Sequence, residues 1–166
     1  MKSNIWKAVA ILAAVSVLVI SQVHRAGAKP SHLDSDGRGL EGTWVVTVQQ
    51  LNCSTIAPLG APFQSLLTFN VGGTMTETTS NPMIYPALRG PGHGVWARTG
   101  WRTYSSSLVA LITLNGALAK TQKITQSIEV DNDSNSFTSN ANVYFYDPAG
   151  NLLVSGCAAA TGTRFE

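Results

Sequence analysis

The sequence predicts an all-β protein, folded as a single eight-stranded up-and-down antiparallel barrel. Three observations carry this prediction. Apolar and polar residues alternate with a period of two, turn-forming residues recur at short intervals, and no internal stretch has a convincing helical period. Short connections of this kind join consecutive strands as hairpins, and eight antiparallel strands can close around one small ligand.

Residues 1–28 have the pattern of a signal peptide. Two lysines precede the apolar run Ala8–Ile20, and a small-residue cleavage site ends at Ala28. An uncleaved membrane anchor is the alternative interpretation, but such a span normally needs about 20 apolar residues. We therefore expect a secreted or periplasmic protein with no membrane attachment after cleavage.

Charged residues make up only 12% of the chain, and the formal net charge is +2. Three of the basic residues, Lys2, Lys7 and Arg25, lie in the expected leader, so the remainder is close to neutral. Nucleic-acid binding needs clustered Lys and Arg, and no nucleic acid is expected as a partner. Residues 29–39 are rich in Pro, Gly, Ser and Asp, which predicts a flexible lead-in to a barrel domain over residues 40–166.

Eight segments of this domain have the alternation of a strand, and turn-forming residues separate them. The expected strands are Thr43–Asn52, Phe63–Val71, Thr74–Thr79, Gly92–Thr99, Trp101–Leu114, Ala117–Val130, Ser136–Tyr146 and Asn151–Phe165. The expected short turns are Gly72-Gly73, Gly100, Asn115-Gly116, Asp131–Asn135 and Asp147–Gly150.

The two ends of the domain predict how the barrel closes. Trp44 lies near the start of the first strand and Arg164 near the end of the last, so antiparallel pairing sets them opposite each other. The same register brings Cys53 to within two residues of Cys157, and alternation puts both cysteines on the other face of the strands. In an exported protein these cysteines are expected to form a disulfide.

Gly42-x-Trp44 on the first strand, with Arg164 placed to pack across the Trp, resembles the signature of the lipocalin-like barrels of the calycin superfamily. In that superfamily the Trp plugs the closed end, the Arg covers it, and the open end admits a small, usually hydrophobic ligand. The resemblance implies structural roles for Trp44 and Arg164 and a ligand in the lumen. The Thr-Asp-Tyr-type motif and the C-terminal helix of typical lipocalins are not evident in this chain.

With Trp44 at the closed end, two long apolar loops, Cys53–Pro62 and Ser80–Pro91, are expected at the open end. Small residues on the last strand would leave unfilled volume beside them. Ordinary packing in the core and on the rim is the alternative interpretation of these side chains. The expected ligand-binding residues are Val48, Leu67, Phe69, Met83, Ile84, Tyr85, Leu108, Ile112, Val143, Phe145, Leu152 and Val154.

Few residues suggest catalysis. The histidines are isolated and no Gly-x-Ser-x-Gly motif is present, so neither a metal site nor a cofactor is expected. Glu77, His93 and Tyr85 are the only acid–base set that can be assembled. Facing inward, Glu77 would pair with Arg98 or Arg102 or act as a base; facing outward, it would be solvated.

Three functions remain open at this point. The leading expectation is a binding protein for a small apolar or amphipathic molecule, because the leader, the barrel closure and the apolar loops all favour it. The second is a small isomerase or cyclase similar to the allene oxide cyclase barrels, in which the cavity mainly shapes a reactive substrate. The third is a protein-binding barrel inhibitor that docks through the loops at its open end.

Overall fold

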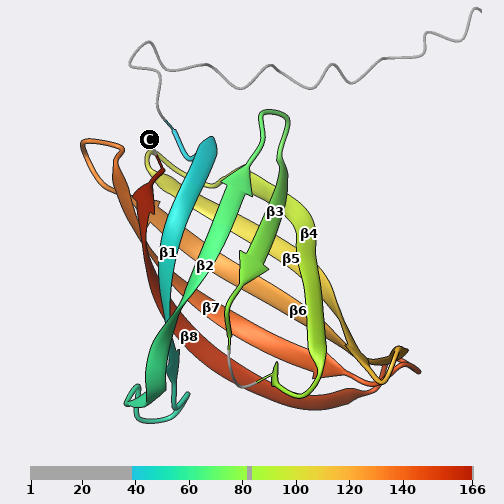
Figure 1. Ribbon diagram of the computed structural model, residues 1–166. Coiled ribbons are helices and arrows are strands. Elements are labelled where there is room, and N and C mark those ends of the chain that lie inside the picture. Colours follow the sequence, from blue (N-terminus) through green and yellow to red (C-terminus); the bar gives the residue numbers. More distant parts are fainter. Residues whose placement is uncertain (1–38, 82–83, 166) are drawn as a thin grey trace, which may run out of the picture. The chain divides into compact units, whose positions relative to one another are not determined.

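In the computed structural model, which describes residues 39–81 and 84–165, the chain forms a closed barrel of antiparallel strands (Figure 1). Each strand pairs with the next along the chain, and the last pairs with the first, so the predicted up-and-down barrel is confirmed. The strands are β1 (Gly42–Leu51), β2 (Pro58–Phe69), β3 (Thr74–Thr79), β4 (Leu88–Arg98), β5 (Thr103–Leu114), β6 (Ala117–Val130), β7 (Ser136–Tyr146) and β8 (Leu152–Arg164). Within these two ranges no helix is long and apolar enough to cross a membrane.

Strands β3, β6 and β7 begin and end at the predicted residues. Strand β2 begins at Pro58 rather than Phe63, because a register shift after Val48 lets Gln50 pair with Leu59. The loop between β1 and β2 is therefore shorter than expected. The alternating pattern before Phe63 is interrupted by Gly60 and two prolines, which is why the sequence did not indicate a strand there.

Strand β4 begins at Leu88 rather than Gly92 for a similar reason. Arg89 pairs with Ile112, and the register then shifts before Gly92 pairs with Ala110. The Gly-Pro-Gly sequence that starts at Gly90 lies in this irregular part of the strand. Strand β5, by contrast, begins two residues later than expected, at Thr103.

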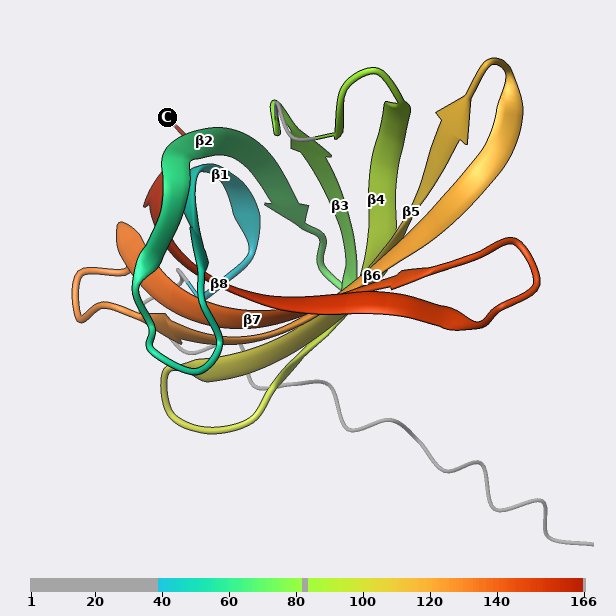
Figure 2. The same ribbon diagram turned by 90° about the horizontal axis from the view of Figure 1, so that it is seen from below.

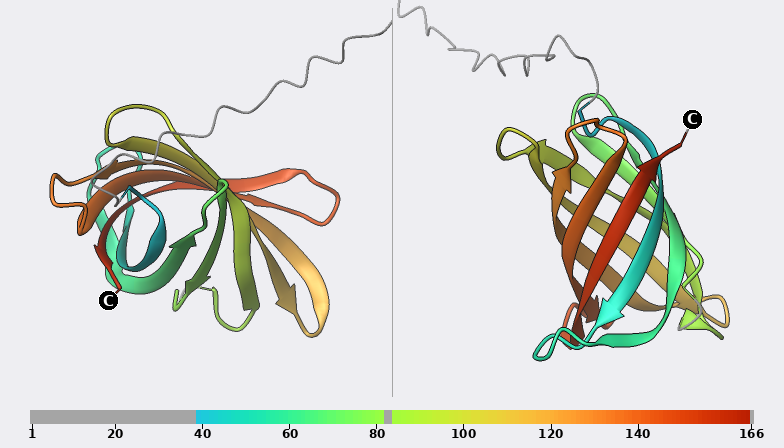
Figure 3. Two further views of the ribbon diagram at one scale, coloured as in Figure 1. Left: turned by 90° about the horizontal axis from the view of Figure 1, so that it is seen from above. Right: turned by 90° about the vertical axis from the view of Figure 1, so that its left-hand side faces the viewer.

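The seam between β1 and β8 closes the barrel in the predicted register. Trp44 is opposite Arg164 and Leu51 is opposite Cys157, and the right-hand view of Figure 3 shows the two strands side by side. Cys53, just beyond β1, forms a disulfide with Cys157 across a Cα–Cα distance of 5.3 Å. The seam is therefore held both by a hydrogen-bonded ladder and by a covalent bond.

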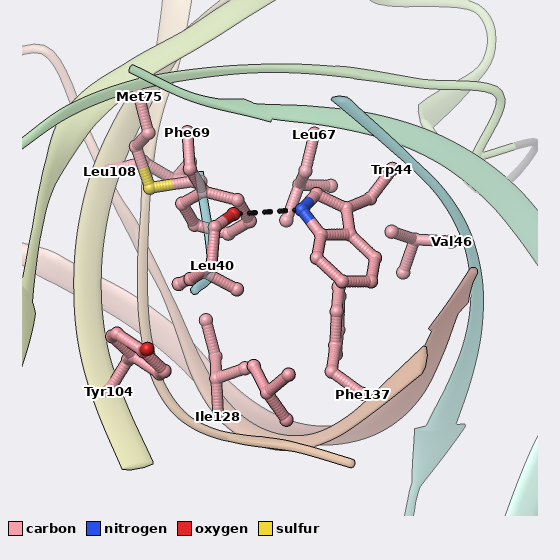
Figure 4. Close-up of a cluster of buried hydrophobic side chains, with 11 residues drawn as sticks. Leu40, Trp44, Val46, Leu67, Phe69, Met75, Tyr104, Leu108, Ile128 and Phe137 are labelled. Atoms are coloured by element: carbon pink, nitrogen blue, oxygen red, sulfur yellow. Dashed lines mark hydrogen bonds between the residues drawn. The ribbon is translucent and has the colours of Figure 1, made fainter. Parts of the chain in front are cut away.

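One end of the barrel is filled by a hydrophobic cluster, which we call the base (Figure 4). Trp44 lies at its centre with no exposed surface, and its ring contacts the Phe137 ring edge-on at a centroid distance of 5.0 Å. The indole Nε1 donates a hydrogen bond to the Leu40 carbonyl at 2.9 Å. Leu40 is itself fully buried, so the residues just before β1 fold inward and help to fill this end of the barrel.

Arg164 covers the base from outside. Its guanidinium carbon lies 4.3 Å from the centre of a Trp44 ring, and its nitrogens donate to the carbonyls of Glu41, Gly39 and Ser134. Gly42 makes this arrangement possible in two ways. Its φ of +118° is one that other residues rarely adopt, and a Cβ there would lie 2.8 Å from Arg164 Nη1.

The strand connections alternate between the two ends of the barrel. The β2–β3, β4–β5 and β6–β7 turns lie at the base, which is uppermost in Figure 1 and faces the viewer in the left-hand view of Figure 3. The β1–β2, β3–β4, β5–β6 and β7–β8 connections lie at the opposite end, which we call the mouth. Figure 2 shows the barrel from the mouth.

Candidate functional site

A cavity of about 590 Å³ occupies the barrel between the base and the mouth. All eight strands contribute to its lining, as do residues 84–87 of the β3–β4 connection. A volume of this size lies within the range of small-molecule sites. The barrel is thus packed solid at one end and hollow at the other.

Most of the expected ligand-binding residues line this cavity. They are Val48, Leu67, Ile84, Tyr85, Leu108, Ile112, Val143, Phe145 and Val154. Met83 and the expected signal peptide lie outside the described residues. The alternation of inward and outward side chains was the signal that placed the strand residues in this set.

Phe69 was expected among the ligand-binding residues, but it belongs to the base and does not line the cavity. It is 1% exposed, and its ring meets the Trp96 ring edge-on at 6.0 Å. Phe69 lies one inward position closer to the base than Leu67, which does line the cavity. Alternation gives the face of a strand but not the depth at which the packed part of the barrel ends.

Leu152 was also expected among the ligand-binding residues, but it does not line the cavity. Phe145 pairs with Val154, whereas the next residue, Tyr146, pairs with Leu152, so Leu153 is an extra residue in β8. This bulge reverses the alternation, and Leu152 is 56% exposed instead of lining the cavity. The sequence does not mark the bulge.

Small residues on the inner face of β8 create much of the free volume. Gly156, Ala158 and Ala160 all line the cavity, and a Cβ added to Gly156 would have no atom within 4 Å. Gly162, further along the same face, is different, because a Cβ there would lie 2.2 Å from a Phe137 ring carbon. The same residue type therefore leaves open space near the mouth and admits an aromatic ring at the base.

A buried polar cluster lies on the opposite side of the cavity. Glu77 of β3 forms an ion pair with Arg89 of β4, with Nη2 and Oε2 2.6 Å apart and both side chains less than a tenth exposed. Arg89 Nε donates to Oε1 of Gln122 on β6, and Ser65 Oγ donates to Glu77 Oε1 at 3.4 Å. Gly92 leaves the room for this carboxylate, since a Cβ there would lie 2.9 Å from Glu77 Oε2.

The expected ion-pair partner of Glu77 was wrong. Of the two orientations considered from the sequence, the inward one is correct. The inward carboxylate pairs with Arg89, however, and not with Arg98 or Arg102. Arg89 was missed because it was assigned to a loop. Gln122 and Ser65 occupy inward-facing positions of the period-two pattern, in line with apolar residues of the same strands. This pattern could have identified them as residues of the lumen.

Burial raises the pKa of the Glu77 carboxyl above its ordinary value of 4.5, because an ionised carboxylate is poorly solvated inside the barrel. The charge of Arg89 and the hydrogen bonds from Arg89 and Ser65 act in the opposite direction and offset part of this rise. The folded protein consequently holds the Glu77 proton more tightly than the unfolded chain does.

This pKa shift predicts a pH dependence of stability. Between pH 4.5 and the higher pKa of the folded state, unfolding releases the Glu77 proton, so the free energy of unfolding falls as pH rises through that window. Glu77→Gln lacks this contribution. Urea unfolding of both proteins over a pH series gives the test: the wild-type stability minus the variant stability should decrease with rising pH, and an increase would contradict the shift.

The expected acid–base set is not assembled in one place. Glu77 lines the cavity and Tyr85 lies at its mouth, but His93 is exposed and lies on the outer face of β4, where it pairs with Thr76 and Val109. Within residues 39–81 and 84–165, no three His, Cys, Asp or Glu side chains gather closely enough to hold a metal ion.

The mouth is surrounded by exposed apolar side chains from all four of its connections and the adjoining strand ends. The largest exposures are those of Tyr85, at 87%, and Leu88, at 74%. The other members are Ile56, Leu59, Leu114, Leu118, Leu152 and Leu153. We call this set the apolar rim, and it borders the entrance to the cavity.

These features define a small closed β-barrel with an internal cavity, compatible with a lipocalin-like fold and with a ligand-binding barrel. Comparison with known proteins found no match: no family model, no curated protein and no solved structure matches this chain. The cavity is therefore the feature of this chain that bears most directly on function.

Proposed function

We propose that this protein binds a small apolar or amphipathic molecule in the lumen of the barrel. The observation that carries the proposal is the cavity of about 590 Å³, which is lined mainly by apolar side chains and lies next to a solidly packed base. Unfilled apolar volume of this size is costly to keep in a protein interior, and burial of an apolar ligand recovers the lost contacts. The apolar rim would ease the passage of such a ligand from its source.

We also propose that the protein belongs to the calycin superfamily and that it is secreted or periplasmic. The stacking of Arg164 over Trp44, together with the positive φ of Gly42, supports membership of the calycin superfamily. The Cys53–Cys157 disulfide supports a secreted or periplasmic location, since disulfides persist in oxidising compartments.

Occupying part of the cavity should weaken ligand uptake. Gly156→Phe places a ring where a Cβ has open space, so we expect reduced Nile red uptake and less of any co-purified small molecule seen by native mass spectrometry. Thr161→Phe is the matched control, because Thr161 is exposed on the same strand and does not line the cavity. It should retain both signals.

The same measurements separate this proposal from its alternatives. A wild-type protein that carries no small molecule and takes up no Nile red would overturn lumen binding. Such a result would favour docking of a partner protein on the apolar rim, whose exposed Tyr85 and Leu88 are the observation that supports that second candidate. Equal uptake by Gly156→Phe and Thr161→Phe would show that the probe binds outside the lumen.

A further inference from the structure

We propose that the ligand has an uncharged hydrogen-bonding head group, such as a hydroxyl, which lies against the Glu77–Arg89–Gln122 cluster while its apolar body lies along β7, β8 and β1. This inference rests on the proposed function and specifies the chemical class of ligand for the same cavity. It follows from the charge balance of the cluster, from its remaining hydrogen-bonding groups and from the distribution of apolar residues around the lumen.

The cluster is electrically balanced before any ligand binds. The ion pair between Glu77 and Arg89 joins one negative and one positive side chain, and Lys120 at the cavity edge is exposed to solvent. A ligand carboxylate or ammonium beside this pair would be attracted by one partner and repelled by the other, so no net opposite charge would offset the loss of its hydration. The cost of removing a charge from water is large inside a barrel, so the arrangement disfavours either charged head group.

Hydrogen-bonding capacity nevertheless remains in the cluster. Arg89 donates from Nε to Gln122 and from Nη1 to the Gly90 carbonyl, and its Nη2 forms the ion pair with Glu77. A guanidinium has five N–H donors, so donors remain for a ligand. Gln122 accepts through Oε1, and its amide nitrogen donates to no other described residue. The buried Thr79 hydroxyl, also on the cavity wall, likewise has no partner among the described residues.

These groups suit a head that both donates and accepts. Buried polar groups without partners are costly, and a ligand hydroxyl can satisfy a donor and an acceptor together without adding charge. An apolar ligand without such a head would leave the Thr79 hydroxyl and the Gln122 amide unpaired. The cluster therefore favours a polar but neutral end on the ligand.

The rest of the lumen favours an apolar body. An apolar wall on the β7, β8 and β1 side of the lumen begins next to the cluster, since Phe145 pairs with Gln122 and Val46 pairs with Ser65. Its members are Val46 and Val48 of β1, Val143 and Phe145 of β7, and Val154 and Ala158 of β8. This wall extends from the base to the mouth, where the apolar rim begins. A molecule with one neutral polar group on an extended apolar chain matches both sides of the cavity.

Three probes with the same chain length test the inference on the wild-type protein: dodecanol, dodecanoate and dodecylamine, each competing with Nile red at neutral pH. Dodecanol should bind at least about tenfold more tightly than either charged analogue, as expected when a charged head group loses its hydration without gaining a net opposite charge. A preference for dodecanoate or dodecylamine, or equal affinities, would overturn the neutral head group while leaving lumen binding intact. Failure of Nile red and of all three probes to bind would instead refute the proposed function.

Two variants test the role of the ion pair. Glu77→Gln leaves Arg89 without its carboxylate, so the affinity for dodecanoate relative to dodecanol should rise about tenfold or more. The double variant Glu77→Met with Arg89→Met removes both charges and keeps apolar volume, which a barrel interior tolerates well. It should still take up Nile red but bind dodecanol about tenfold more weakly.

A surface substitution provides the control. Arg102→Gln alters an ion pair with Glu129 that is partly exposed and does not line the cavity, and it should leave all probe affinities unchanged. Circular dichroism establishes that each variant is folded. If folded Glu77→Gln shows the wild-type order of affinities, and the double variant binds dodecanol as the wild type does, the cluster does not hold the head group.

Discussion

Replacement of Trp44 by Ala should lower the free energy of unfolding by about 3 to 5 kcal/mol, the usual cost of removing a buried Trp side chain. The indole has no exposed surface, it packs on Phe137, and Arg164 covers it. Its loss would open a void at the base and leave the Leu40 carbonyl without its hydrogen bond. Chemical denaturation of the purified variant measures the effect.

Trp101→Ala is the matched control for this prediction. Trp101 is 79% exposed, so removal of the same side chain from the surface should change stability by no more than about 0.5 kcal/mol. Trp44→Phe should fall between the two, since it keeps a ring but loses the Nε1 hydrogen bond. Similar losses for Trp44→Ala and Trp101→Ala would contradict the central place of Trp44 in the base.

Loss of the Cys53–Cys157 disulfide should destabilise the protein by up to about 4 to 5 kcal/mol under the loop-entropy argument. The two cysteines are separated by 104 positions, so the bond constrains most of the unfolded chain. Cys53→Ser with Cys157→Ser should therefore unfold at a clearly lower denaturant concentration than the oxidised wild type. Reduction of the wild type should bring its transition close to that of the variant.

The variant also supplies the control for chemical reduction. Without cysteines to reduce, its unfolding transition should not move when reductant is added, because the described residues contain no free cysteine. A reductant effect of equal size on both proteins would mean that the reagent acts elsewhere. An unchanged wild type in reductant, with the bond shown to be broken, would refute the stabilising role.

The barrel could be predicted from the sequence because the patterns that define its strands and turns are local and recur along the chain. Alternation gave the inward faces, turn residues gave the hairpins, and the pairing of Trp44 with Arg164 followed once the terminal strands were set antiparallel. The cysteine pair followed from the same register. Each of these inferences uses only positions counted along strands.

The candidate site was harder to predict because it depends on irregularities. Arg89 lies in a strand whose register shifts at a Gly-Pro-Gly sequence, so alternation did not assign it a face. The bulge at Leu153 turned Leu152 outward, and the depth of the base excluded Phe69 from the cavity. Bulges and cavity depth are set by packing among distant strands, which no single stretch of sequence contains.

The pairing of β1 with β8 also has a consequence for the order of events during folding. Every other strand pair can form as a local hairpin, but this one joins residues near the two ends of the described chain. Until Arg164 has been synthesised, β1 has no partner on one side and remains an open edge that other chains can extend. Closure of this long-range contact should therefore be a late and slow step, and the interval before it is when aggregation is most probable.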